Sequence, residues 1–163
     1  MQLRAITPLD WDAILDIQDE CYSQLDPEPL HVLQSKWLVS PKTCFVIEHQ
    51  GALVGYCLAH PWTVDTPPSL YQEITTLPKA NSLYLHDIAI SAKAQGLGAG
   101  RKVLNQLHHL ANELGLTSLS LVAVQGADSY WLKMGFSQKA IDKCLASYTD
   151  DACYMVSPLI AQV

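Results

Sequence analysis

The sequence predicts an α/β fold, and three features lead to this prediction. An alternating segment, a helix with capping signals and a hairpin come first in the chain. A strand, a glycine-rich turn, a helix and another strand then follow one another between residues 83 and 124. Two short strand-like stretches complete the pattern. The 163 residues contain no linker, repeat or low-complexity tract, so we expect a single domain, residues 1–163.

The first elements carry clear local signals. Polar and apolar residues alternate over positions 2–6, as in a strand. Thr7 is a candidate N-cap, Pro8 suits the first helical position, and Asp10 completes a capping box. A second helix is expected from Leu30 to Leu38, before the break at Ser40-Pro41. The apolar residues of the first helix recur at helical spacing, at Trp11, Ile14, Ile17 and Cys21.

A hairpin and a long connection come next. Thr43–Glu48 and Ala52–Ala59 read as strands joined by a turn at Gln50-Gly51. The segment 61–82 contains four prolines and few apolar residues. A connection of about 20 residues exceeds the usual 4–6. Such a length is typical of a functional loop or lid, and equally of a surface insertion.

The second half of the chain alternates strands and helices. The helix after the glycine-rich turn has one apolar stripe and ends near Leu114, before Gly115. The expected strands are Leu83–Ile90, Leu116–Val124, Phe136–Ala140 and Ala152–Leu159, and a short helix is expected over Ala127–Met134.

Composition and charge exclude several classes of protein. Apolar residues make up 49% of the chain, which is enough for a substantial core. The net charge of −6 argues against a general affinity for nucleic acid or an anionic membrane, because both need a basic surface. There is no signal-peptide pattern and no run of about 18 apolar residues, so we expect a cytoplasmic protein without a membrane span.

The cysteine pattern favours reduced thiols. Their number is odd, and they form neither a CxxC motif nor a Cys/His metal spacing, so no metal site is expected. The five are Cys21, Cys44, Cys57, Cys144 and Cys153.

The glycine-rich turn predicts an anion site. Glycines at 96, 98 and 100 let the backbone approach a ligand closely. The following helix begins there, and its first amides point outward at the positive end of the helix dipole. A pyrophosphate suits such a site. Arg101 and Lys102 add positive charge beside it.

Three ligand classes use turns of this kind. A dinucleotide-binding turn would need glycine where Arg101 stands, and a P-loop would need a Gly-Lys-Ser/Thr triplet, which the sequence lacks. The third pattern is Q/R-x-x-G-x-G/A, which residues 95–100 match in full. This is the pyrophosphate signature of the GNAT N-acetyltransferases.

The chain therefore resembles the GNAT superfamily. Residues 85–90, LHDIAI, are similar to the family's fourth strand, and residues 127–136 are similar to its A-x-x-F-Y-x-K-x-G-F segment. The resemblance is sharp from residue 83 to 136 and looser elsewhere. It implies a three-layer α-β-α fold whose central mixed sheet has splayed parallel strands four and five.

The resemblance also implies how acetyl-CoA is bound. The pantetheine arm would lie between the splayed strands and pair with the backbone of Ile88, Ala89 and Ile90. Lys93 or Arg101 would reach the outer phosphates. The pyrophosphate would be held by the amides of Gln95, Gly96, Leu97, Gly98, Ala99 and Gly100.

The reaction implied is direct transfer of acetyl to an amine. An alkyl amine has a pKa near ~10 and must lose a proton before attack, so the site needs a base. His86 and Asp87 in the middle of strand four are the candidates, and each has a structural role as its alternative. Side chains alternate along a strand, so we expect only one of them to face the cleft. Glu48 on the hairpin is a weaker candidate.

The proton donor to the leaving thiolate is less defined. The family's tyrosine corresponds here to Trp131, which cannot donate a proton at a useful pKa. Tyr130 precedes it and points elsewhere by roughly 100° on a helix. Either Tyr130 is repositioned, or another residue serves, or solvent protonates the thiolate, which a thiol pKa near ~8.5 tolerates. Val124 is a second departure, since many relatives have a CoA-contacting Asn there.

Two further groups of residues have mainly structural interpretations. Cys153 would allow a route through an acetyl-cysteine, but a lone strand cysteine is usually part of the core. Five aromatic residues in the helices and the long loop correspond to the family's acceptor wall and would suit a cationic or aromatic amine. They are Trp11, Tyr22, Trp37, Trp62 and Tyr71.

The sequence thus predicts an acetyl-CoA-dependent N-acetyltransferase that acts on a primary amine of a small molecule. A protein or peptide N-terminus is the second choice of substrate. A non-catalytic acyl-CoA-binding module and an interaction protein that kept only the fold are the alternatives. Many GNAT proteins dimerise, so a homodimer is a further expectation.

Overall fold

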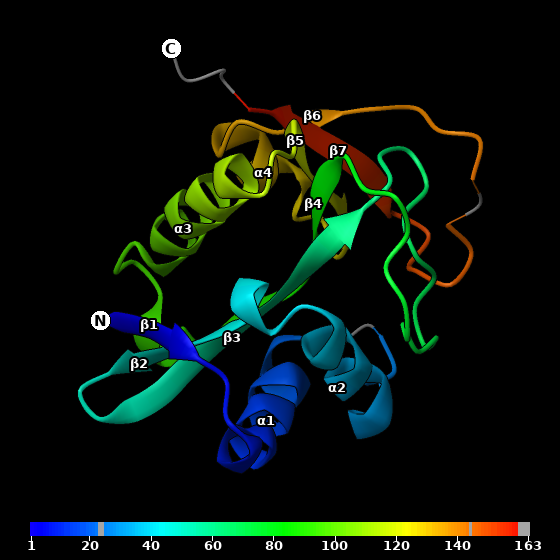
Figure 1. Ribbon diagram of the computed structural model, residues 1–163. Helices are drawn as coiled ribbons and strands as arrows, with labels where there is room; N and C mark the ends of the chain where they lie inside the picture. Colours follow the sequence, from blue (N-terminus) through cyan, green and yellow to red (C-terminus); the bar gives the residue numbers. More distant parts are fainter. Residues whose placement is uncertain (23–24, 144, 160–163) are drawn as a thin grey trace.

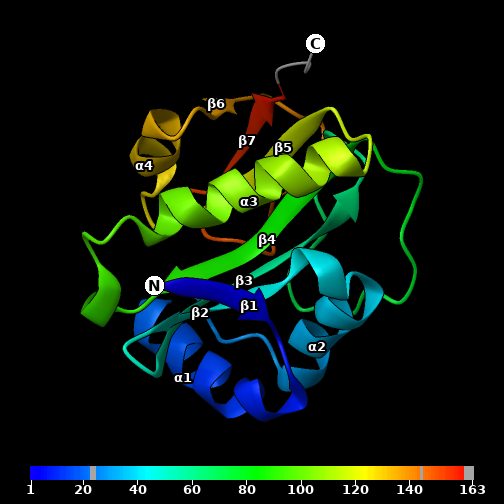
Figure 2. The same cartoon turned by 60° about the vertical axis from the view of Figure 1, so that its left-hand side comes forward.

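A seven-stranded sheet runs through the middle of the molecule, with helices on both faces (Figures 1 and 2). The computed structural model describes residues 1–22, 25–143 and 145–159. The strand order is β1-β2-β3-β4-β5-β7-β6, and β4 and β5 are the parallel pair. The strands are β1 (Gln2–Ala5), β2 (Phe45–His49), β3 (Ala52–Trp62), β4 (Ser82–Ile90), β5 (Ser118–Ala123), β6 (Ser137–Gln138) and β7 (Cys153–Pro158). The helices are α1 (Trp11–Cys21), α2 (Leu30–Val39), α3 (Ala99–Glu113) and α4 (Asp128–Lys133).

The helices divide into two layers, which gives the expected three-layer arrangement. Helices α3 and α4 cover one face of the sheet, and α1 and α2 cover the other (Figure 2). The α3 stripe of Val103, Leu104 and Leu107 is fully buried against the sheet. On the opposite face, Ile14 and Leu33 are also fully buried. Each layer therefore has its own hydrophobic core.

The N-terminal signals act as expected, with one difference. A 3₁₀ turn, Pro8–Asp10, precedes α1, so the first turn is tighter than a continuous α-helix. The carboxylate of Asp10 accepts the backbone N–H of Thr7 at 2.7 Å. The guanidinium of Arg4 donates to both oxygens of the same carboxylate at 2.8 Å. These bonds fix the entry of the chain into α1.

Several element boundaries differ from the sequence prediction. Strand β3 continues past Ala59 to Trp62, which shortens the long connection to residues 63–81. The stretch Phe136–Ala140 forms only the two-residue strand β6, because it pairs with β7 at the edge of the sheet. A short 3₁₀ turn at Ala92–Ala94 leads into the glycine-rich turn.

The described cysteines are free thiols. Cys44 and Cys57 are buried, and Cys21 and Cys153 are partly buried; Cys144 lies outside the described residues. Among the helices of the described ranges, none combines the length and the apolar character that crossing a membrane requires.

Strands β4 and β5 separate soon after they meet. Both lie wholly within the described part of the chain, and their parallel register covers three pairs of residues. Beyond Tyr84, β4 continues for six residues without β5 beside it. The expected splay is thus confirmed. The three registered pairs are Ser82 with Ser118, Leu83 with Leu119 and Tyr84 with Ser120.

The open part of β4 is held by β3, where Gly55 allows close packing. A Cβ atom at Gly55 would lie 2.8 Å from the carbonyl oxygen of Ala89 and 2.8 Å from Cδ1 of Ile47. The absence of a side chain therefore lets β2, β3 and β4 approach one another at this level of the sheet.

Replacing Gly55 by Ala should destabilise the fold by about 1–3 kcal/mol, because the added methyl group overpacks this contact. Urea unfolding of the variant measures the change. Gly51→Asn is a matched control, since no other atom lies within 4 Å of a Cβ there and Asn tolerates its φ of +79°. Equal losses of stability in the two variants would contradict this account of Gly55.

Candidate active site

The separation of β4 and β5 opens a cleft of about 480 Å³, here called the splay cleft. One wall is β4, and the other is β5 with the start of the connection to α4. The C-terminal end of α1 and the side chains of Tyr130 and Trp131 close its ends. The lining residues fall in the segments 20–22, 85–90, 92, 95, 121–125, 127 and 130–131.

The glycine-rich turn lies at the end of β4 and forms the N-terminus of α3. Gly96 and Gly98 have φ values of +79° and +77°, which glycine adopts without strain. The first bond of the helix runs from the N–H of Lys102 to the carbonyl of Gly98, at 3.1 Å. The N–H groups of Ala99, Gly100 and Arg101 precede it, so they have no intrahelical acceptor. These three N–H groups lie where the sequence predicts an anion site.

Other members of the turn have different partners. The N–H groups of Gln95 and Leu97 donate to the carbonyls of Ala92 and Ala94, each at 3.4 Å. The ammonium group of Lys102 donates to the carbonyl of Met1 at 2.7 Å, so its charge is directed to the N-terminus rather than to the anion site. The expected place of Lys102 beside the anion stays a prediction.

Two backbone positions of β4 face the splay cleft. The N–H of Ser91 donates to Val54 of β3 at 2.7 Å. In an antiparallel pair the backbone groups alternate in direction, so Ala89 faces β3 while Ile88 and Ile90 face the cleft. Of the three residues expected to pair with pantetheine, Ile88 and Ile90 are thus directed suitably.

Helix α1 contacts the same two positions. The hydroxyl of Tyr22 donates to the carbonyl of Ile88 at 2.7 Å, and the thiol of Cys21 donates to the carbonyl of Ile90 at 3.4 Å. A carbonyl oxygen has two lone pairs, so these contacts do not exhaust its capacity. The end of α1 therefore fixes this wall of the cleft.

A β-bulge changes the direction of the next residues. In the register of β3 and β4, Leu58 pairs with Asp87 and Ala59 with Leu85, so His86 is an extra residue. Leu85 packs into the core beneath α3, whereas His86 and Asp87 both contact groups on the α1–α2 side. Both residues line the splay cleft, so the expectation that only one of them faces it is wrong, because the bulge interrupts the alternation.

Asp87 is a buried carboxyl group beside the cleft. It is 8% exposed, and its Oδ2 accepts the hydroxyl of Tyr56 at 2.7 Å. Its Oδ1 is buried without a hydrogen-bond partner among the described residues. Burial raises the pKa of Asp87 to about 6, although His86 and the Tyr56 hydroxyl favour the ionised form. The carboxyl thus titrates near neutral pH, which suits a general base.

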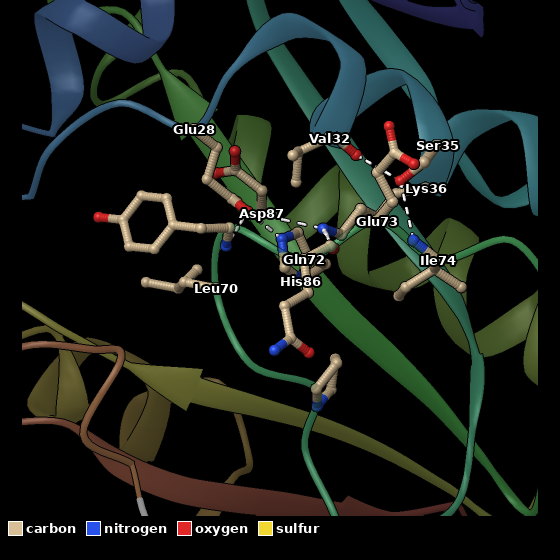
Figure 3. Close-up of polar contacts among 12 residues, drawn as sticks. Glu28, Val32, Ser35, Lys36, Leu70, Gln72, Glu73, Ile74, His86 and Asp87 are labelled. Carbon is tan, nitrogen blue, oxygen red and sulfur yellow. Dashed lines mark hydrogen bonds and ion pairs between the residues drawn. The ribbon is translucent and has the colours of Figure 1, made fainter.

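The imidazole of His86 is held by Glu28, from the segment between α1 and α2 (Figure 3). The Nε2 of His86 and the Oε1 of Glu28 are 2.9 Å apart. The other oxygen of Glu28 accepts the N–H of Tyr71 at 2.9 Å and lies 3.5 Å from the ammonium of Lys36. That ammonium also donates to the carbonyl of Gln72 at 2.7 Å. One carboxylate thereby joins α2, β4 and the 63–81 loop.

Glu28 and Lys36 form a buried ion pair, with side chains 8% and 0% exposed. Burial opposes the ionisation of Glu28, but the bond with His86 and the charge of Lys36 outweigh it and lower the pKa of Glu28 to about 2. Burial lowers the pKa of Lys36, against the attraction of Glu28. We therefore expect Glu28 to be an anion at neutral pH.

A second cavity, here called the inner cavity, adjoins the splay cleft. Its volume is about 60 Å³. Tyr22, His86, Asp87, Val122 and Val124 line both spaces, so the two meet where β4 and β5 separate. The remaining lining residues are Gln18, Leu25, Asp26, Pro27, Glu28, Leu70 and Tyr148.

Tyr130 and Trp131 occupy different environments. Trp131 is 7% exposed and packs edge-on against Phe136 in the core beneath α3. Tyr130 is 44% exposed, and a side chain at Gly100 would overlap its hydroxyl group. Gly100 is thus needed for the close approach of Tyr130 to the first turn of α3.

Several candidates lie away from both cavities. Glu48 accepts the Nε of Arg4 at 2.7 Å near the edge of the sheet. Trp11 and Trp37 pack on each other between α1 and α2, with ring centroids 5.6 Å apart. Cys153 is partly buried on β7. Of the five aromatic residues proposed for the acceptor wall, Tyr22 alone lines the cavities described here.

Sequence reasoning missed the Glu28–Lys36 pair. Lys36 stands three and four residues after the apolar Leu33 and Val32, so a charge on the buried face of α2 was the available signal. Glu28 lies between two prolines in a segment interpreted only as a break. In the described part of the chain, no group of three or more His, Cys, Asp or Glu is arranged to hold a metal ion.

Replacing Glu28 by Gln should lower the free energy of unfolding by about 3–5 kcal/mol, because it leaves the buried Lys36 without a counter-charge. Adding Lys36→Met to this variant should recover a large part of the lost free energy of unfolding, since no unpaired charge is then buried. Urea unfolding at neutral pH measures both. A single variant as stable as the wild type would contradict the pairing.

The fold is similar to solved structures of several activities. Ard1 from Thermoplasma volcanium is 16% identical, with 98% of each chain covered and a TM-score of 0.74. The GphF GNAT-like decarboxylase in complex with isobutyryl-CoA is also 16% identical, with 98% of this chain and 100% of that chain covered and a TM-score of 0.81. The ribosomal-protein-S18-alanine N-acetyltransferase from Escherichia coli is 16% identical, with 99% and 96% covered and a TM-score of 0.68.

These similarities concern the fold, since the identities are low. No curated protein matches the sequence. The sequence model of the acetyltransferase (GNAT) family matches residues 11–136, which include the splay cleft's β4 wall, the glycine-rich turn and α4. The protein therefore belongs to the GNAT acetyltransferase family, whose members transfer an acyl group from acyl-CoA.

Proposed function

We propose that this protein transfers an acetyl group from acetyl-CoA to an amine by direct attack in a ternary complex. The observation that carries the proposal is the buried Asp87 carboxyl at the junction of the splay cleft and the inner cavity. One cavity would hold the thioester and the other the amine. Asp87, with a pKa of about 6, would take the proton that the amine must lose.

The glycine-rich turn and β4 would hold acetyl-CoA. The amides at the start of α3 suit the pyrophosphate, with Arg101 next to them. The N–H and carbonyl groups of Ile88 and Ile90 suit the pantetheine amides, and an N–H at this wall would polarise the thioester carbonyl. Tyr130, with its hydroxyl at Gly100, and solvent are the two sources of a proton for the leaving thiolate.

The charges around the cavities favour an amine as the acceptor. They disfavour an acceptor with an acidic group, and also an acyl group that carries a carboxylate. The linings contain Glu20, Asp26, Glu28 and Asp87 but no Lys or Arg. A carboxylate would be repelled there, and an ammonium group would be attracted.

The rival function is an acyl-CoA-binding module without turnover. The observation that favours it is Trp131, which stands in the cleft lining at the position of the family's tyrosine and cannot donate a proton at a useful pKa. This rival predicts binding of acetyl-CoA without release of thiol in the presence of any amine.

Acetyl-CoA should stabilise the protein, and Gly98→Leu should abolish the effect. At 100 times its dissociation constant a ligand adds about 2.7 kcal/mol of stability, which a thermal-shift titration detects. A side chain at Gly98 would block the close approach of the phosphates and strain a φ of +77°. Gly51→Leu has the same strain at φ +79° far from the cleft and should keep the response. A response lost in both variants, or absent in the wild type, would refute the assigned site.

The rate of thiol release with an amine should fall below pH ~6. Asp87 acts as a base only when ionised, and its pKa is about 6, so kcat/KM should decrease about tenfold per pH unit on the acid side. Tyr56→Phe removes a hydrogen bond that favours the ionised form of Asp87, so the decrease of kcat/KM should begin at a higher pH in this variant.

Asp87→Asn should lower kcat/KM by a factor of about 10²–10⁴. The decrease of kcat/KM below pH ~6 should disappear as well, and acetyl-CoA should still stabilise the variant. An unchanged pH profile in Asp87→Asn would show that another group is the base.

A further inference from the structure

Two buried polar atoms beside the inner cavity have no hydrogen-bond partner among the described residues: Nδ1 of His86 and Oδ1 of Asp87. The His86 side chain is 0% exposed and Asp87 is 8% exposed. Native proteins pair nearly all buried polar groups, so an exception needs an explanation. A ligand that donates hydrogen bonds to both atoms would supply one.

The contact with Glu28 selects the tautomer of a neutral His86 ring. A carboxylate only accepts, so the 2.9 Å contact places a proton on Nε2 of His86. In the neutral ring, Nδ1 then carries a lone pair. Lys36 and the N–H of Tyr71 hold Glu28 in place on its other oxygen. With this tautomer, the two adjacent residues of the bulge that line the cavity carry two acceptors without a partner among the described residues, Nδ1 and Oδ1.

The charge of the inner cavity favours a cation. Asp26, Glu28 and Asp87 are among its lining residues, and the lining contains no Lys or Arg. The ammonium of Lys36 is directed to Glu28 and to the carbonyl of Gln72 instead. A primary ammonium group has three N–H donors for the two acceptors, and its positive charge is attracted by the acidic residues of the lining.

The walls limit the size of the ligand. The cavity of about 60 Å³ accommodates roughly two water-sized groups. Leu70 and Val122 supply apolar surface for a short carbon chain.

Three of the hydrogen bonds that hold the 63–81 loop lie close to Leu70 in the chain. The hydroxyl of Tyr71 donates to the carbonyl of Asp26 at 2.9 Å, and the N–H of Leu70 donates to the Ser147 hydroxyl at 3.1 Å. The hydroxyl of Tyr148 donates to the carbonyl of Pro68 at 2.7 Å. The 63–81 loop is thus tied to the segments on both sides of the cavity, which keeps Leu70 in the wall.

We propose that the inner cavity binds the acceptor as a compact primary ammonium group, held by Nδ1 of His86 and Oδ1 of Asp87. This proposal rests on the proposed N-acetyltransferase function and names its substrate class. A proton passes from the ammonium to Oδ1 of Asp87. The nitrogen lone pair then bonds to the thioester carbonyl carbon, the C–S bond breaks, and the nitrogen gives its second proton to the leaving thiolate through solvent. The products are the N-alkyl acetamide and CoA, and Asp87 releases the first proton to solvent.

The test is thiol release from acetyl-CoA with methylamine, ethylamine, butylamine and an unblocked tripeptide. We expect kcat/KM for methylamine or ethylamine to exceed that for the tripeptide by tenfold or more, in keeping with roughly 10–200-fold per misfitting methylene. Leu70→Ala should raise the ratio of kcat/KM for butylamine to kcat/KM for ethylamine by about tenfold. Leu77→Ala, a surface-exposed change on the same loop outside the cavity lining, should leave this ratio unchanged.

A second variant tests the two-acceptor arrangement. His86→Gln keeps an amide donor for Glu28 but has no ring nitrogen facing the cavity. It should raise KM for ethylamine about tenfold and leave the thermal shift with acetyl-CoA unchanged.

The outcomes separate this proposal from the proposed function. A tripeptide acetylated as well as ethylamine overturns the compact-amine proposal and leaves the transferase function intact. A thermal shift with acetyl-CoA but no thiol release with any amine of the panel also overturns it and favours a binding module. No thermal shift with acetyl-CoA refutes the proposed function itself.

Discussion

The early end of parallel pairing between β4 and β5 is the constraint on which the site depends. After Tyr84 the six remaining residues of β4 keep their bonds to β3 but have no strand on their other side. Backbone groups of Ile88 and Ile90 are thereby directed to an open cleft rather than to a neighbouring strand. The glycine-rich turn starts where β4 ends, so the anion site at α3 lies at the end of the same cleft. A sheet that stayed paired would have neither feature.

The second determinant is the bulge at His86, which gives the α1–α2 side of β4 two polar residues in succession. Both are buried, so each needs support from elsewhere. Tyr56 of β3 supports Asp87, and Glu28 supports His86. Glu28 is itself held by Lys36 of α2, by the N–H of Tyr71, and by Gln18 of α1, whose Oε1 accepts the Glu28 N–H at 3.2 Å. The two residues of β4 are therefore positioned by contacts with β3, with Glu28 and, through Glu28, with α1, α2 and the 63–81 loop, which is the support that a preorganised site requires.

The sequence predicted the fold and the glycine-rich turn well, because these depend on local patterns. The glycine spacing at 96, 98 and 100 indicates a turn, the apolar stripe of α3 indicates a helix, and the structure has both. The polar network around His86 and Asp87 was predicted poorly, because it depends on contacts between distant segments. Nothing in the local sequence around Asp87 indicates a bulge opposite Leu58, and Glu28 meets His86 across 58 positions of the chain. Periodicity therefore assigned these two residues to opposite faces.

The departure at Trp131 has a simple energetic interpretation. At pH 7 an alkyl amine with a pKa near ~10 resists deprotonation by about 3 pH units, or roughly 4 kcal/mol, whereas a thiolate with a thiol pKa near ~8.5 takes up a proton from solvent favourably. The chemistry therefore needs a base more than it needs an acid. The structure agrees with this asymmetry: Asp87 is buried with its pKa raised toward neutrality, while Trp131 packs against Phe136 and strengthens the core. Under the proposed function, loss of the family's tyrosine is thus compatible with turnover, because the proposed base, Asp87, is retained.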